Sequence, residues 1–102
     1  MKIALVTRPI DRDTLFSMVL PLPEEKSEFG FEVKPKELKD FNMVIILGTG
    51  QEALVRDLND FGEAFPPIVY LYTMQKPELD NRNTYLFKLP EQKVEFMAFL
   101  QD

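Results

Sequence analysis

The residues best suited to chemistry follow the apolar runs of the chain. Lys88 ends "TYLFK", Thr7 and Arg8 follow "KIALV", and Tyr72 and Thr73 end "IVYLYT". A lysine or arginine at such a position can bind an anion or pair with a neighbouring carboxylate. The hydroxyl groups of Tyr72 and Thr73 are the only candidate nucleophiles here, which makes an enzyme the weakest hypothesis. The alternative for Lys88 is a strand-end lysine whose ammonium group simply reaches water.

The composition excludes several kinds of site. The chain has no Cys and no His, which excludes disulfides, zinc sites of the usual kind and His-based acid–base catalysis. Its 12 Lys and Arg residues are scattered, and its net charge is −5, so direct nucleic-acid binding by this domain has little electrostatic support. The longest apolar run, "MVIIL", is too short to span a bilayer. We therefore expect a cytoplasmic protein without membrane association, metal or cofactor.

Four near-continuous apolar runs predict strands that are buried on both faces of a parallel sheet. They cover residues 2–6, 42–47, 68–73 and 84–89. A fifth run, "GFEVK" (30–34), is shorter and alternates between apolar and polar residues. It predicts a strand that lies nearer an edge of the sheet.

Helical patterns lie between these strands. One begins at Asp11 or Asp13 and stops before Pro21, a second covers "GTGQEALVRDLNDFGEAF" after the strand at 42–47, and the last begins with Pro90 in its first turn. Alternating strands and helices favour a parallel sheet with helices on both faces.

We therefore predict one α/β domain over residues 1–102, with a five-stranded parallel sheet in the flavodoxin-like order 2-1-3-4-5. The segments 35–41 and 74–83 are short, so we expect shortened linking helices before strands 3 and 5. A chain that starts with Met1 and ends within a helical pattern is also compatible with the N-terminal part of a longer protein. Ligands of such sheets bind beyond the carboxyl ends of the strands, where the candidate residues lie.

The order of elements and several local runs resemble a bacterial receiver domain of the response-regulator type. "KIALVTRPIDRDTLFSMVL" is similar to the start of that family, and "FNMVIIL" and "PPIVYLYT" look like its third and fourth strands. "TYLFKLP" resembles its fifth strand, where a lysine follows an aromatic switch residue by three positions. Lys88 and Tyr85 match these two positions.

The departures from the family pattern concern its phosphorylation site. Receivers place acidic residues after the first strand to hold Mg²⁺, because this ion needs hard oxygen ligands. An Asp at the end of the third strand accepts the phosphoryl group, and the transfer requires neutralisation of the phosphate charge. Here Thr7-Arg8-Pro9 occupies the first position and Leu47 or Gly48 the second. The resemblance therefore implies a degenerate receiver, whose pocket keeps two cations, Arg8 and Lys88, without an evident anion.

The glycines after the third strand support a second hypothesis. Gly48, Thr49 and Gly50 lie between a buried strand and a helix, where backbone N–H groups can bind phosphate. The run lacks the Lys-Ser or Lys-Thr of a P-loop, and a tight turn also accounts for its glycines. The alternative function is thus a domain that binds a nucleotide or a sugar phosphate.

The last helix carries more apolar residues than one face can hold. Phe96, Phe99 and Leu100 are candidates for a surface that contacts a protein partner or a second copy of the chain. A short helix that buries both sides is the alternative. Our leading hypothesis is a non-enzymatic regulatory domain, a degenerate receiver that controls an output module in transcription through such contacts.

Overall fold

A computed structural model describes residues 1–48, 52–79 and 83–101 of the chain. They form a five-stranded sheet whose strands are β1 (Lys2–Thr7), β2 (Glu25–Phe29), β3 (Met43–Leu47), β4 (Ile68–Tyr72) and β5 (Thr84–Lys88). All neighbouring strands are parallel, and their order is β2-β1-β3-β4-β5. The predicted flavodoxin-like order is therefore confirmed.

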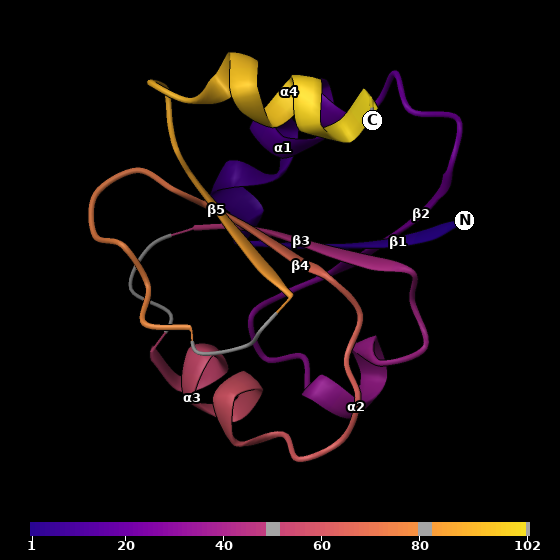
Figure 1. The fold of residues 1–102 in the computed structure, drawn as a ribbon. Helices are drawn as coiled ribbons and strands as arrows, with labels where there is room; N and C mark the ends of the chain where they lie inside the picture. Colours follow the sequence, from indigo (N-terminus) through magenta and orange to yellow (C-terminus); the bar gives the residue numbers. More distant parts are fainter. Residues whose placement is uncertain (49–51, 80–82, 102) are drawn as a thin grey trace.

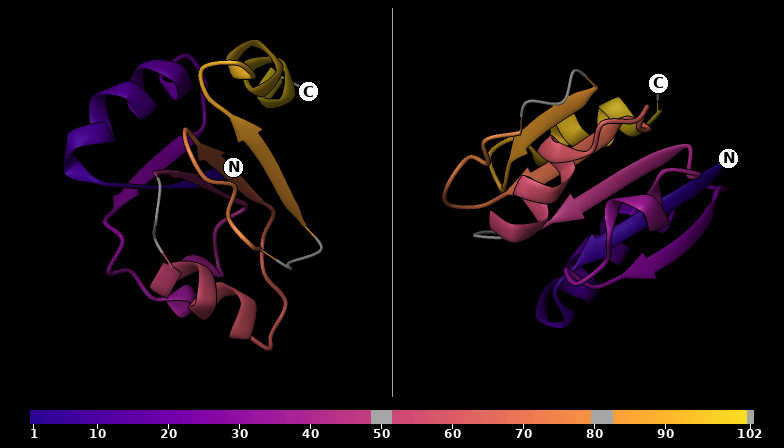
Figure 2. Two further views of the ribbon diagram at one scale, coloured as in Figure 1. Left: turned by 90° about the vertical axis from the view of Figure 1, so that its left-hand side faces the viewer. Right: turned by 90° about the horizontal axis from the view of Figure 1, so that it is seen from below.

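Helices lie on both faces of this sheet, as predicted. In the described residues they are the short 3₁₀ helix η1 (Pro9–Asp11) and the α-helices α1 (Arg12–Val19), α2 (Pro35–Leu38), α3 (Glu52–Asp60) and α4 (Lys93–Gln101). Helices α1 and α4 cover one face, and α2 and α3 cover the other (Figure 1). Figure 2 shows the same layers from two further sides. None of the described helices is long and apolar enough to cross a membrane.

Each face of the sheet carries its own hydrophobic core, because successive side chains of a strand point to opposite faces. The face below α1 and α4 is built from Ile3, Leu5, Ile45, Leu47, Val69 and Leu71. The face below α2 and α3 is built from Ala4, Val6, Val44, Ile46, Ile68 and Tyr70. The near-continuous apolar runs of the sequence therefore reflect burial on both sides.

The links before β3 and β5 are short, as the sequence predicts. Helix α2 has only four residues, and the described residues 73–79 between β4 and β5 contain no helix. A parallel crossover usually places a helix on the sheet. Here a segment without helix runs beside α3 instead.

The prediction of a strand at residues 30–34 is wrong. The edge strand is β2, which pairs with β1 from Lys2 opposite Glu25 to Val6 opposite Phe29. Residues after it turn, with the N–H of Val33 donating to the carbonyl of Gly30 at 3.2 Å. The run "EKSEF" has a single apolar residue, but an edge strand is held by backbone hydrogen bonds and one half-buried face. The expectation of an edge position was correct.

The ends of two helices follow local signals. Helix α1 ends at Val19, two residues before Pro21, as expected. Helix α4 begins at Lys93 and not at Pro90, because residues 89–92 form a turn. In that turn the N–H of Gln92 donates to the carbonyl oxygen of Lys88 at 2.7 Å.

Candidate functional site

The polar candidates from the sequence lie along one edge of the sheet, since the strands are parallel. Thr7 is the last residue of β1 and stands opposite Leu47, the last residue of β3. Tyr72 ends β4 and stands opposite Lys88, the last residue of β5. Thr73 follows β4 and is exposed. This edge is where open α/β sheets bind ligands.

The side chains at this edge point to different layers. Thr7 is buried and shares a face with Leu47, below α1 and α4, and its Oγ1 has no hydrogen-bond partner among the residues that the structure describes. Tyr72 packs into the opposite core, on the side of α3. Lys88 is exposed. The candidate residues therefore lie along the same edge of the sheet, but their functional groups do not point to a common site.

Each candidate cation has a carboxylate beside it. Arg8 Nε donates to Asp11 Oδ2 at 2.7 Å, and Lys88 Nζ lies 3.5 Å from Glu91 Oε2. The expectation of two cations without an anion is therefore wrong. The reason is local: η1 and the turn after β5 both bring the residue three positions later back towards the cation. Such exposed pairs stabilise a fold only weakly.

The end of β3 is closed on both sides. Leu47 is 4% exposed and belongs to the core. The N–H of Gly48 donates to the carbonyl of Leu71 at 3.2 Å, so this donor is not free for an anion. The ring of Phe31 lies where a Cβ on Gly48 would stand. Thr49 and Gly50, the rest of the predicted anion loop, lie outside the described residues.

An aromatic cluster joins β5 to α4. Its contacts are between Tyr85 and Phe99, with ring centroids 4.8 Å apart, and from Phe87 to Phe96 and Phe99 at 5.8 and 5.6 Å. Tyr85 is 44% exposed, whereas Phe96 is fully buried. The expectation that Phe96 lies on a contact surface is therefore wrong, because this residue belongs to the core. Phe99 and Leu100 are half-buried at the margin of the core.

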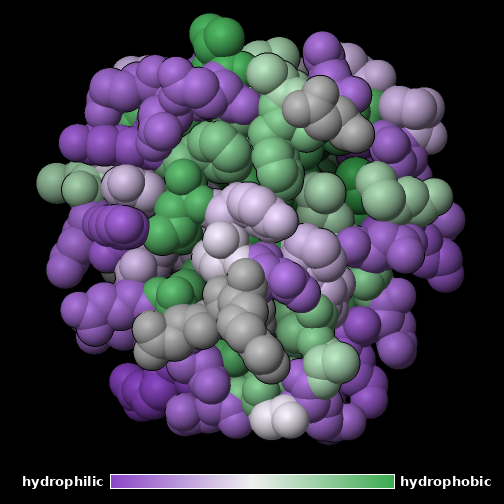
Figure 3. Space-filling view, in the orientation of Figure 1, coloured by the Kyte–Doolittle hydropathy of each residue, from purple (hydrophilic) through white to green (hydrophobic). Residues whose placement is uncertain are grey.

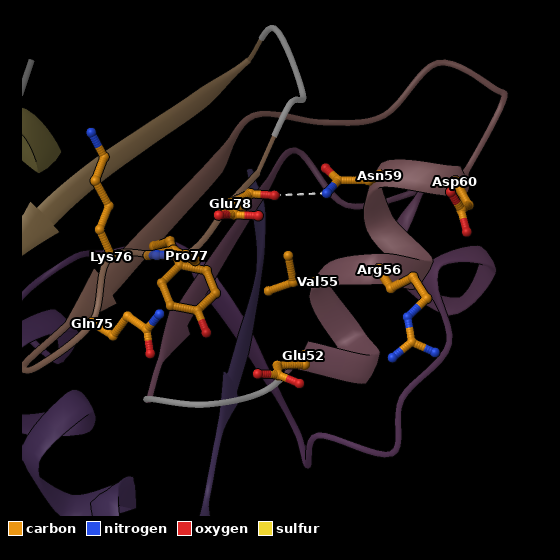
Figure 4. A pocket seen from close by; sticks show the side chains of 10 residues that line it. Glu52, Val55, Arg56, Asn59, Asp60, Gln75, Lys76, Pro77 and Glu78 are labelled. Carbon is orange, nitrogen blue, oxygen red and sulfur yellow. Dashed lines mark hydrogen bonds between the residues drawn. The ribbon is translucent and has the colours of Figure 1, made fainter.

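Sequence reasoning missed a groove on the other face of the sheet. It lies between α3 and the segment 75–78 and has a volume of about 570 Å³ (Figure 4). The residues that line it are Glu52, Val55, Arg56, Asn59, Asp60, Tyr70, Gln75, Lys76, Pro77 and Glu78. The polar stripe of α3 at i, i+4 and i+7 was the available signal, but such stripes usually face water.

Metal ligands are not clustered in the part of the chain that the structure describes. There, no group of three or more Asp and Glu side chains is placed to hold an ion. At the strand edge the carboxylate of Asp11, which follows β1, is already paired with Arg8. The residues at this edge therefore do not fit a divalent cation, which prefers several free oxygen ligands.

Comparison with solved structures agrees with this fold. The crystal structure of a response regulator receiver domain protein from Bacillus halodurans C-125 superimposes with a TM-score of 0.64, covering 97% of this chain and 95% of that one. The two sequences are 13% identical, so the likeness concerns the fold. Scans of protein-family models and of curated proteins give no match. The chain thus has a receiver-like α/β fold.

Proposed function

We propose that this chain is a degenerate receiver, a regulatory domain that does not catalyse phosphoryl transfer and acts through protein contact. The observation that carries the proposal is the chemistry at the carboxyl edge of the sheet. A receiver-like fold implies a signalling role, and the strand ends here carry Thr7, Leu47 and Gly48 where phosphorylation needs carboxylates.

The surroundings of these residues support the same conclusion. Leu47 is packed in the core, Phe31 fills the space beside Gly48, and Arg8 is paired with Asp11. Lys88, which the resemblance assigns to the phosphoryl group, is instead paired with Glu91. Thr7, Leu47 and Gly48 carry no carboxylate that could bind Mg²⁺ or accept a phosphoryl group.

The proposed contact surface is formed by β5 and α4. β5 is an outer strand of the sheet, and its Tyr85 is exposed and packs against the ring of Phe99 of α4. Val94 of α4 is 78% exposed. Figure 3 shows hydrophobic residues on the face of the molecule over which α4 passes in Figure 1. Exposed aromatic residues of this kind mark contact surfaces, and a second copy of the chain is the partner we propose.

The loss of phosphorylation is tested with acetyl phosphate and Mg²⁺, followed by intact-mass analysis. We expect no phosphoryl adduct on the wild-type chain. Titration with beryllofluoride and Mg²⁺ is expected to leave the amide resonances next to Leu47 and Lys88 unchanged. A stable adduct on Asp or Glu, or a saturable shift at these amides, contradicts the proposal.

Self-association is tested by sedimentation velocity at several protein concentrations. We expect a concentration-dependent dimer, and we expect Tyr85→Lys to raise its dissociation constant at least about tenfold. Met74→Lys is the matched control, because Met74 is 81% exposed and follows β4 outside the proposed surface. A wild-type chain that stays monomeric, or an equal effect of both variants, rules the surface out.

A further inference from the structure

The groove beside α3 lies where the described residues 73–79, which follow β4, form no helix. One wall is α3, with Glu52, Val55 and Asn59, and the other is the segment 75–78. Asn59 Nδ2 donates to the backbone carbonyl of Glu78 at 2.7 Å and ties the two walls together (Figure 4). The groove has a volume of about 570 Å³, which lies within the range of about 300–1,000 Å³ that is typical of small-molecule sites.

The floor of the groove contains an unusual polar group. Tyr70 of β4 is only 1% exposed, yet it lines the groove. Its hydroxyl makes no hydrogen bond with any residue that the structure describes, and burial alone raises the pKa of the phenol. The hydroxyl is not one of the buried polar atoms that lack a partner, and it gives the groove a group that can donate or accept a hydrogen bond, which phenylalanine would not. A ligand in the groove can therefore pair with this hydroxyl.

The walls of the groove favour a cationic ligand. Three acids, Glu52, Asp60 and Glu78, line it against two bases, Arg56 and Lys76. Figure 4 shows that the Lys76 side chain extends away from α3, while the carboxylate of Glu52 is directed towards the side of Gln75. Between the walls the groove therefore presents the Glu52 carboxylate and the Gln75 side-chain amide, whose oxygens accept hydrogen bonds from an ammonium group.

The groove also has an apolar part. Val55 projects from α3 into the space between the walls, and Pro77 lies on the opposite wall (Figure 4). Together with the ring of Tyr70 they can cover a short hydrocarbon or aromatic body. An inorganic cation would leave this part of the groove unfilled.

We propose that the groove binds a small organic ammonium ion, whose N–H groups donate to the Glu52 carboxylate and the Tyr70 phenol oxygen. Its apolar body lies on Val55 and Pro77. The groove is on the face of α2 and α3, opposite the α4 surface, so this proposal goes beyond the regulatory function above and is tested independently of it.

The test is an amide NMR titration of the whole chain with benzylamine, benzyl alcohol and benzoate, which share one apolar body and differ in charge. Benzylamine is expected to shift amides of residues 52–60 and 75–78 in a saturable manner. Benzyl alcohol is expected to bind at least about tenfold more weakly, because a charge-assisted hydrogen bond is lost. Absence of saturable shifts with benzylamine, or tighter binding of benzoate, overturns the proposal.

Two variants assign the contacts. Glu52→Gln is expected to weaken benzylamine binding about tenfold and Tyr70→Phe about fivefold, with folding intact since both replacements keep the side-chain shape. Glu95→Gln, an exposed carboxylate of α4, is the matched control and is expected to leave affinity unchanged. Equal affinity of the wild type and both groove variants overturns the assignment of the site.

Discussion

The ring of Phe31 occupies the space that a side-chain carbon on Gly48 would need. Phe31 follows β2 and Gly48 follows β3, and these two strands flank β1 in the sheet. The ring therefore reaches across the carboxyl end of β1, the place where a doubly wound sheet usually receives its ligand. The ring thus takes up space at the edge where such a ligand would bind.

The first prediction concerns this contact. Gly48→Ala is expected to lower the free energy of unfolding by about 1–3 kcal/mol, because the new methyl group displaces the Phe31 ring. In a Phe31→Leu background the same substitution is expected to have a smaller effect. Urea unfolding of the wild type, the two single variants and the double variant gives the coupling energy between the two positions. Equal effects in both backgrounds would show that the ring is not the obstacle.

A second prediction concerns the lysine at the end of β5. The Lys88 and Glu91 side chains are 47% and 57% exposed and 3.5 Å apart, so Lys88→Ala is expected to change the free energy of unfolding by less than about 1 kcal/mol. Glu91→Ala is expected to have a similarly small effect. Urea unfolding at low and high salt checks both. A loss of more than about 3 kcal/mol would indicate a buried role for the lysine.

Gln92 provides a third prediction, about the outer edge of β5. Its Oε1 accepts from the N–H of Lys88 at 2.8 Å, and its own N–H donates to the Lys88 carbonyl. Gln92→Ala is expected to lose about 1 kcal/mol and to speed hydrogen exchange of the Lys88 amide. Gln92→Glu keeps the acceptor and is expected to preserve protection of that amide. Unchanged exchange in Gln92→Ala would exclude the bond.

The fourth prediction is a dependence of stability on alkaline pH. Burial raises the pKa of Tyr70 above its ordinary value of 10.0, so the folded chain holds the phenol proton more tightly than the unfolded chain. This contribution to stability is complete below about pH 10 and is lost as the pH rises through the pKa of the folded state. Urea unfolding from pH 8 to about pH 11 is expected to show a steeper loss for the wild type than for Tyr70→Phe. Parallel curves would contradict it.

The fifth prediction separates the core of α4 from its surface. Phe96 is fully buried, and Phe96→Ala is expected to lower the free energy of unfolding by about 3–5 kcal/mol. Val94 is exposed, so Val94→Ala is expected to stay within about 0.5 kcal/mol of the wild type. Thermal or urea unfolding of the monomer checks both values. Comparable losses would place both residues in the core.

The sheet and its strand order follow from the sequence alone. The runs that became β1, β3 and β4 are largely apolar, because each strand is covered on both faces and most of its side chains are buried. Helical patterns between them require parallel crossovers, which leave few topologies. The residues of the carboxyl edge could therefore be placed in advance.

Only the tertiary structure decided where the edge strand lies and what surrounds each candidate residue. β2 is polar because backbone hydrogen bonds to β1 hold it, so its composition did not distinguish it from the turn that follows. The carboxylates beside Arg8 and Lys88, the burial of Phe96 and the groove beside α3 depend on how turns and helices pack against the sheet. Periodicity shows that a residue is apolar or polar, whereas packing selects the neighbour that it meets.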